Sequence, residues 1–318
     1  MKKLISIVIP ACNEQDNIIP MVKAILKAVP GIFDTEVILV DDGSRDQTKA
    51  KVLSLTKDKR IKGIFLYRNF GHQAALLAGI HSATGEAVIT MDADFQHPPE
   101  VIPQMLKLWQ QGHDLVVAQR NSRDNKGWPR LLQPFRLIGY GLYKLLAGKT
   151  LYPGVSDFRL MDKTVAEYLR QCSEYRAILR GLVMLPARQI VFIPYQLGLR
   201  RSGKSKYPFV KLLNLFIFSI TSFSLAPLRF ALYIGALIVI STFCYAIYVV
   251  VDKILLHKPI IEGWTSMVVL ISILFGMLFF YLGLLGEYIG ALFEEVKRRP
   301  RYMVESTINL SKHHKSHL

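Results

Sequence analysis

Short apolar runs rich in β-branched residues alternate with amphipathic stretches along the first 120 residues of the chain. Continuous apolar runs of this length are typical of strands buried on both faces of a sheet, and the stretches between them are typical of helices that cover it. The alternation therefore predicts an α/β domain built on a mostly parallel sheet. The predicted strands are residues 6–10, 36–42, 61–67, 86–92 and 114–120, and the predicted helices are residues 15–29, 46–57, 72–83 and 99–111.

Two longer apolar runs follow later in the chain. Phe230 to Val251 and Trp264 to Leu285 each contain 22 residues without a formal charge. At a rise of about 1.5 Å per residue, each run reaches about 33 Å and can cross a hydrocarbon core of about 30 Å. Buried core helices are the alternative, but such helices keep a polar stripe and neither run has one. Two transmembrane helices are therefore predicted.

Basic residues accumulate beside these runs. Residues 188–229 contain seven Lys or Arg and no Asp or Glu, and basic residues follow the second run. Because such residues gather on the cytoplasmic side, both termini are predicted to be cytoplasmic, in a multi-pass protein of the inner membrane. The predicted layout is a cytosolic catalytic domain over residues 1–207, interfacial amphipathic helices over 208–227 (a third span is the alternative), a two-helix hairpin within 228–290 and a basic cytoplasmic tail over 291–318.

Overall composition removes several classes of protein. With 51% apolar residues and a net charge of +16, the chain is not an intrinsically disordered one. Its three scattered cysteines make no disulfide framework and fit a reducing compartment. The basic residues lie beside the apolar runs and not along a soluble helix, which favours anionic lipid head groups over nucleic acid as their partner.

Two acidic residues end the fourth predicted strand. Asp92 and Asp94 are two residues apart, and in an extended chain such residues point the same way, so both carboxylates can face one ion. Oxygen ligands of this kind suit Mg²⁺ or Mn²⁺, which commonly bridge carboxylates to substrate phosphates. The alternative is a solvated turn in which Asp94 caps the following helix.

Polar residues also follow the first two strands. Asp41 and Asp42 precede Gly43, which allows a tight turn, and a carboxylate here can bind ribose hydroxyls or a base edge. Glu14 ends the first strand and could accept hydrogen bonds from a nucleotide base. Helix capping is the alternative at both places. A phospho-acceptor receiver domain also has an acidic pair at a strand end, but it leaves the later acids and the apolar runs unexplained.

Residues 198–205 match the phosphate-cradling pattern G-x-x-x-x-G-K-[ST]. A nucleotide-hydrolysing membrane protein is therefore one alternative, although Pro208 interrupts the helix that such a loop needs. A flexible cationic loop beside the bilayer, positioned to bind a lipid phosphate, explains the same residues better. His72, His81 and His97 have no metal-ligand spacing and are interpreted as surface or packing residues.

The order of these motifs resembles the inverting family 2 glycosyltransferases with the Rossmann-like GT-A fold. Within that family it is similar to the polyprenyl-phosphate glycosyltransferases, the relatives of dolichol-phosphate mannose synthase and bactoprenol glucosyltransferases. The resemblance covers nearly the whole chain. The segments that carry it are IVIPACNE (7–14), VDDGSRDQT (40–48), RNFGHQAALLAGI (68–80), MDADFQHPPE (91–100), SDFRLMD (156–162) and RRSGKSKY (200–207).

The resemblance implies roles for individual residues. The nucleotide would be held by Pro10, Ala11, Glu14 and Asp42. Asp92 would contact the sugar-nucleotide and join Asp94 and Gln96 around Mg²⁺ or Mn²⁺. Phosphates of donor or acceptor would be engaged by Arg200, Arg201, Ser205 and Lys206, and Asp157 and Arg200 join the two acids as catalytic candidates near the acceptor.

The implied reaction is the transfer of one hexose from UDP-glucose to undecaprenyl phosphate, with inversion at the anomeric carbon. The Gln-x-x-Arg-Trp motif of processive synthases is absent from the sequence, which favours a single sugar per cycle. GDP-mannose as the donor and a non-enzymatic membrane scaffold are the remaining alternatives. Small residues in the apolar runs, such as Gly276 and Gly283, permit close helix packing and a homo-oligomer.

Overall fold

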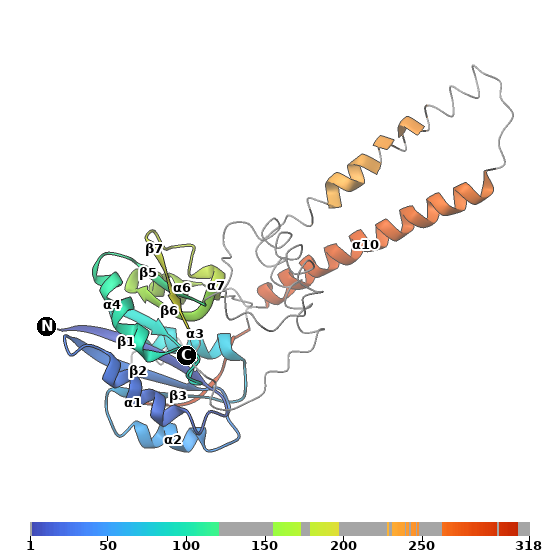
Figure 1. Cartoon of the computed structure of the whole chain (residues 1–318). Coiled ribbons are helices and arrows are strands. Elements are labelled where there is room, and N and C mark those ends of the chain that lie inside the picture. The colour runs from blue at the N-terminus through green and yellow to red at the C-terminus, as the bar shows by residue number, and fades with distance from the viewer. Residues whose placement is uncertain are drawn as a thin grey trace. The chain divides into compact units, whose positions relative to one another are not determined.

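The computed structural model describes residues 2–120, 155–172, 179–196, parts of 228–247, 263–297 and 299–310. The chain divides into two compact units. The first contains all the described strands, and the second contains the long helix α10, Trp264–Val296 (Figure 1).

The first unit is built on a sheet whose eight described strands lie in the order β7-β5-β6-β4-β1-β2-β3-β8. β3, β2, β1 and β4 are parallel to one another. β6 is antiparallel to both β4 and β5, and β8 is antiparallel to β3. The strands are β1 (Lys3–Ala11), β2 (Phe33–Asp41), β3 (Ile61–Leu66), β4 (Ala87–Thr90), β5 (Leu115–Arg120), β6 (Val155–Asp162), β7 (Ile190–Tyr195) and β8 (Val304–Ile308).

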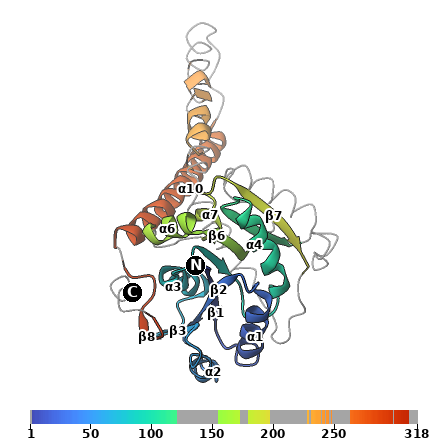
Figure 2. The ribbon, with the colours of Figure 1, turned by 90° about the vertical axis from the view of Figure 1, so that its left-hand side faces the viewer.

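Helices cover both faces of this sheet (Figure 2). One apolar core joins α1, α2 and α4 to side chains such as Ile7, and the other joins α3, α6 and α7 to side chains such as Val8. Because neighbouring residues of a strand face opposite cores, the strands are apolar throughout. The helices are α1 (Ile18–Ala28), α2 (Thr48–Leu55), α3 (His72–Ser82), the 3₁₀ turn η1 (Pro99–Val101), α4 (Ile102–Gln110), α6 (Lys163–Gln171) and α7 (Leu179–Leu182).

The five predicted strands are confirmed as β1 to β5, and the four predicted helices as α1, α2, α3 and η1 with α4. Three further strands, β6, β7 and β8, are not among these five. β6 carries Asp157 and Arg159 in its interior, where a buried strand is expected to be apolar, and the two side chains pair with each other. β8 lies within the segment expected to be a basic tail.

Residues 299–310 return to the first unit and pack against it. β8 pairs with β3 along its outer edge, and Asn309 Nδ2 donates to the carbonyl oxygens of Thr56 and Ile61. Tyr302 is buried, with its hydroxyl 2.7 Å from His81 Nδ1. The expected tail over 291–318 therefore contains the end of α10 and an edge strand, which covers the exposed backbone groups of β3.

Within α10, residues Ile273–Val296 have a mean hydropathy of 1.7 and are long and apolar enough to cross a membrane. Side chains such as Phe279, Phe280 and Ile289 are exposed, a pattern typical of lipid-facing helices. The predicted span 264–285 lies inside this helix, which continues to Val296. Of the other predicted span only parts are described, including a shorter apolar helix, Ala231–Tyr245. The predicted interfacial helices over 208–227 lie outside the described residues.

Glu36 ties several elements together at the amino-terminal edge of the sheet. Its side chain is buried, forms an ion pair with Lys62 and accepts hydrogen bonds from Ser6 and from Thr84. Burial alone would raise the pKa of Glu36, but the hydrogen bonds from Lys62, Ser6 and Thr84 outweigh burial and hold the pKa below that of an ordinary glutamate. The carboxylate therefore stays ionised and fully paired.

Replacing Glu36 by Ala is expected to lower the free energy of unfolding by about 3 kcal/mol, because Lys62 is left largely buried without its partner. The matched control is Glu86→Ala, which removes a longer and solvent-exposed pair with Lys3 and should cost no more than about 0.5 kcal/mol. Chemical denaturation of the full chain in detergent measures both. Equal losses in the two variants would show that the buried Glu36–Lys62 pair stabilises the fold no more than the exposed pair does.

The Glu36–Lys62 pair also predicts that the free energy of unfolding depends on pH. Since the pKa of Glu36 is lower in the folded than in the unfolded chain, its stabilisation is complete at neutral pH, begins to decrease near the unfolded value of about 4.3 and is lost as the pH falls through the lower pKa of the folded chain. The difference in unfolding free energy between wild type and Glu36→Ala should therefore shrink as the pH is lowered. A difference that stays constant over this range would show that the carboxylate charge does not stabilise the fold.

Candidate functional site

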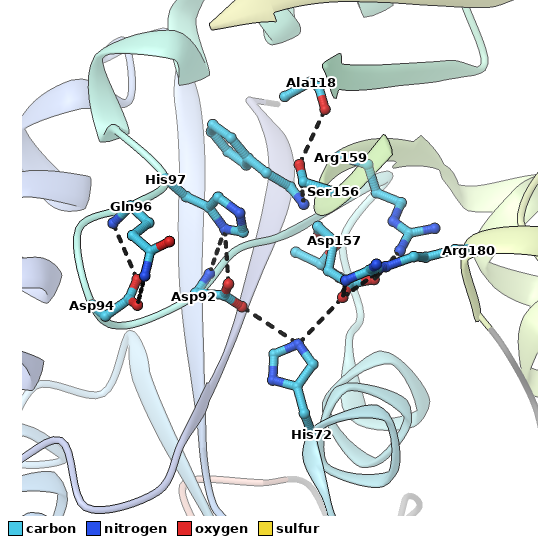
Figure 3. A network of polar contacts seen from close by, with 12 residues as sticks. His72, Asp92, Asp94, Gln96, His97, Ala118, Ser156, Asp157, Arg159 and Arg180 are labelled. Carbon is cyan, nitrogen blue, oxygen red and sulfur yellow. Dashed lines mark hydrogen bonds and ion pairs between the residues drawn. The ribbon is translucent and has the colours of Figure 1, made fainter. Parts of the chain in front are cut away.

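The two acidic residues after β4 do not continue the strand. β4 ends at Thr90, and the chain then bends through residues 93–97, where Phe95 has a φ of 63°. Asp92 turns towards His72 and His97, whereas the Asp94 carboxylate accepts two hydrogen bonds from Gln96, at 3.1 Å and 2.6 Å (Figure 3). The expectation of an extended chain is wrong here, because the bend separates the contacts of the two carboxylates.

His97 anchors the loop that carries Asp92. The Nδ1 atom of this buried imidazole accepts a hydrogen bond of 2.9 Å from the backbone N–H of Asp92. Its ring stacks on Phe158 with the centroids 5.1 Å apart and meets Tyr195 edge-on. Burial lowers the pKa of His97 by disfavouring the imidazolium, more than the nearby carboxylates raise it. The interpretation of His97 as a packing residue is thus confirmed, and this packing also positions Asp92.

Asp157, on β6, is the centre of an ion cluster. It is 2% exposed and accepts hydrogen bonds from Arg159, from Arg180 at the start of α7 and from Gln73 at the start of α3. Burial opposes ionisation of this carboxyl, but the hydrogen bond from His72 and the charges of the two arginines hold its pKa well below the usual range. Asp157 is therefore a permanent anion within the site.

His72 connects this cluster to Asp92. Its Nε2 atom lies 3.4 Å from Asp92 Oδ1 and 3.5 Å from Asp157 Oδ2. Burial disfavours its protonation, but the hydrogen bond to Asp157 and the two negative charges outweigh burial and raise the pKa of His72. The interpretation of His72 as an ordinary residue missed this contact. The available signal was its position at the start of the helix that follows the third strand, at the edge where the other polar residues gather.

A second group of residues lies after β1 and β2. Asp42 is buried, and its two carboxylate oxygens accept the backbone N–H groups of Phe70 and Gly71, which fixes the loop that enters α3. Gly43 has a φ of 63°, and a Cβ atom on it would lie 2.5 Å from the backbone of Arg68, so only glycine fits this turn. Asp42 thus shapes the loop around this end of the sheet.

The end of β1 is held against β2 and the loop that follows it. Pro10 and Ala11 pair with the last residues of β2, and Asn13 accepts the backbone N–H of Arg45. The Glu14 carboxylate accepts a hydrogen bond of 2.6 Å from Asn17. The structure therefore brings Pro10, Ala11, Glu14 and Asp42 to one edge of the sheet, next to β4. Arg200, Arg201, Ser205 and Lys206 lie outside the described residues, as does the possible phosphate loop over 198–205.

Two observations indicate that Asp92 and Asp94 are suited to bind a divalent cation. Asp92 Oδ1 is buried and accepts no hydrogen bond within the described residues, and Asp94 together with Gln96 offers carboxylate and amide oxygens. In the described part of the chain, no group of three or more His, Cys, Asp or Glu side chains is placed to hold a metal. Mg²⁺ and Mn²⁺ need only one or two carboxylates when substrate phosphates complete the shell, so this donor set suits them.

Comparisons with known proteins agree with this architecture. Residues 6–170 match the family described as Glycosyl transferase family 2, and residues 226–292 match the GtrB C-terminal hairpin. A glycosyltransferase of Synechocystis sp., itself uncharacterised, is 36% identical over 94% of this chain and 94% of its own. The bactoprenol glucosyl transferase of Shigella phage SfX is 35% identical over 95% of this chain and 99% of its own.

Among solved structures, a glucosyl-3-phosphoglycerate synthase of Mycobacterium tuberculosis covers 69% of this chain and 76% of its own at 20% identity, with a TM-score of 0.47. The expected GT-A architecture is confirmed by the family match and by the mostly parallel sheet in which β6 runs antiparallel between β4 and β5. The chain therefore belongs to glycosyl transferase family 2 and carries that family's domain ahead of a C-terminal hairpin.

Proposed function

We propose that this protein transfers a single hexose, glucose, from a UDP-sugar to polyprenyl phosphate at the cytoplasmic face of the membrane. The observation that carries the proposal is the similarity to a bactoprenol glucosyl transferase over 95% of the chain, with the hairpin included. The apolar helix α10 supports a membrane location, where the phosphate of such an acceptor is found.

The donor would lie along the edge formed by β2, β1 and β4. Asp42, Glu14, Pro10 and Ala11 would face the nucleotide, and Asp92 would face the sugar. The loops at this edge are fixed before any substrate binds, by Asp42 on one side and by His97 on the other. Such preorganisation places the reacting carbon without a further entropic cost, and attack from the opposite face converts an α-linked donor into a β-linked product.

Asp92, Asp94 and Gln96 would hold Mg²⁺ or Mn²⁺, which supplies positive charge beside the departing diphosphate. The chain's own contribution is the orientation of the two acids. His97 fixes the backbone of Asp92, and Gln96 fixes the carboxylate of Asp94. This arrangement keeps both acids at the edge where parallel strands end, which is the usual ligand position in sheets of this type.

The acceptor needs little activation. The second pKa of a phosphate monoester is about 6, so its oxygen is already largely anionic near neutral pH. A strong general base is therefore unnecessary, and catalysis would depend on position and charge. Arg200, Arg201, Ser205 and Lys206 are proposed to bind phosphates of the donor or of the acceptor.

The proposed function is tested with purified protein, a panel of radiolabelled nucleotide sugars and undecaprenyl phosphate. We expect label to enter the organic phase from UDP-glucose and only when both the lipid phosphate and a divalent cation are present. Extraction and scintillation counting give the measurement. Transfer from GDP-mannose in preference to UDP-glucose would overturn the choice of donor, and lipid-independent nucleotide hydrolysis would overturn the proposed reaction.

The proposed metal site predicts that Asp94→Asn reduces the rate of transfer by about 10²- to 10³-fold, because an amide does not neutralise the cation that faces the diphosphate. Stabilisation of the protein by UDP with Mn²⁺, followed as the shift of its melting temperature, should be lost as well. The control is Asp34→Asn, an exposed aspartate on β2. A variant that keeps both transfer and the UDP-dependent shift would remove Asp94 from the metal site.

A further inference from the structure

Arg180 is held in a fixed position although half of its side chain reaches solvent. Its Nε atom lies 3.2 Å from both oxygens of Asp157, and its Nη2 atom lies 2.8 Å from Asp157 Oδ2. The side chain is 49% exposed, and within the described residues Asp157 accepts every hydrogen bond that it donates. A guanidinium has five N–H donors, and those on Nη1 make no hydrogen bond within the described residues.

Asp157 does not need Arg180 for its own neutralisation. Arg159 forms an ion pair with it, and both side chains of that pair are almost completely buried. Gln73 and His72 also contact the Asp157 carboxylate. One carboxylate therefore contacts two guanidiniums, and Arg180 is the one of the two that is partly exposed. Arginine in such a position is well suited to bind a phosphate oxyanion.

The order of the strands indicates where the Arg180 guanidinium would lie relative to a bound donor. From β2 through β1 and β4 to β6, the edge of the sheet carries Asp42, Glu14, Asp92 and then Asp157. Asp94 and Arg180 lie on opposite sides of Asp92 (Figure 3). A donor that extends from β2 to Asp92 therefore leaves Arg180 beyond the sugar, on the side from which an attacking group must approach.

We propose that Arg180 binds the phosphate monoester of the acceptor and that Asp157 is a positioning residue, which fixes the Arg180 guanidinium. This proposal rests on the proposed transfer to a lipid phosphate. Asp157 would then act through Arg180 and not by removing a proton, which agrees with its burial between two guanidiniums. The donor diphosphate is the other source of a phosphate at this site, and the experiment separates the two sources.

The first experiment measures initial rates of Arg180→Gln in the full chain, with UDP-glucose and undecaprenyl phosphate varied in turn. We expect the KM for the lipid phosphate to rise about 10- to 100-fold, as for the loss of hydrogen bonds to a charged group. The KM for UDP-glucose should stay within about twofold of the wild-type value. Arg180→Lys keeps the charge but loses the two-pronged geometry of the guanidinium. Its KM for the lipid phosphate should therefore lie between those of the wild type and of Arg180→Gln.

The matched control is Arg60→Gln. Arg60 also donates from Nε and Nη2 to an aspartate, Asp58, but it precedes β3 at the amino-terminal edge of the sheet. Its substitution should leave both KM values unchanged. Arg180→Gln is expected to fold, because Asp157 keeps its pair with Arg159, and a melting temperature close to that of the wild type would confirm it.

The variant Asp157→Asn tests whether Asp157 positions Arg180 or removes a proton. A positioning role predicts that this variant raises the KM for the lipid phosphate as Arg180→Gln does, and that the double variant is no worse than Arg180→Gln alone. A general base would instead lower kcat without raising this KM. If Asp157→Asn shows no cooperative melting, the comparison of Arg180→Gln with Arg180→Lys decides the proposal.

The outcomes distinguish a failure of the proposed function from a failure of the role proposed for Arg180. If wild-type protein transfers no sugar to undecaprenyl phosphate, the proposed function fails and the role of Arg180 fails with it. If wild type is active and Arg180→Gln keeps a normal KM for the lipid phosphate, only the present inference is overturned. A rise confined to the KM for UDP-glucose would assign Arg180 to the donor diphosphate and would also overturn it. Competitive inhibition by inorganic phosphate against the lipid, present in wild type and lost in Arg180→Gln, would support the proposal.

Discussion

A buried carboxylate must be paired, and in this protein the pairing of Asp157 constrains much of the site. Its partners come from β6, α3 and α7, so the ion cluster fixes these elements relative to one another at the end of β4. The same cluster reaches Asp92 through His72. Because Asp157 and Arg159 are both almost completely buried, loss of either one would leave an unpaired charge in a region of low dielectric. The position of Asp92, and hence of the proposed donor site, depends on this cluster.

The edge of the sheet consequently has two chemical characters. Around β1, β2 and β4, acidic and amide side chains are combined with tightly held loops, an environment suited to a nucleotide and a cation. Around β6 and α7, guanidinium groups exceed the carboxylate that they contact, an environment suited to an anion. A transferase that moves a sugar to a phosphate acceptor would need both environments next to each other, because leaving group and acceptor meet across one carbon atom. The proposal of a phosphate acceptor explains why the second environment is basic.

Much of the first unit could be predicted from local pattern. Strands buried on both faces are apolar throughout, so β1 to β5 and the helices between them were evident. β6 and β8 were not, since one carries charged residues that are compensated only by distant partners, and the other is a short edge strand about 240 residues along the chain from its partner, β3. The separation of Asp92 from Asp94 was missed because a bend with Phe95 in the left-handed region has no clear sequence signal.

By itself, the sequence determined the α/β class, the apolar runs and the set of polar residues that end the first, second and fourth strands, because each follows from periodicity or from neighbours in the chain. Its motifs also indicated the family. Only the tertiary structure decided that His72 joins Asp92 to Asp157, that His97 holds the loop, and that Arg180 keeps a cationic group towards solvent. These contacts join residues from different elements, and their energies depend on burial and on charges that sequence spacing does not encode.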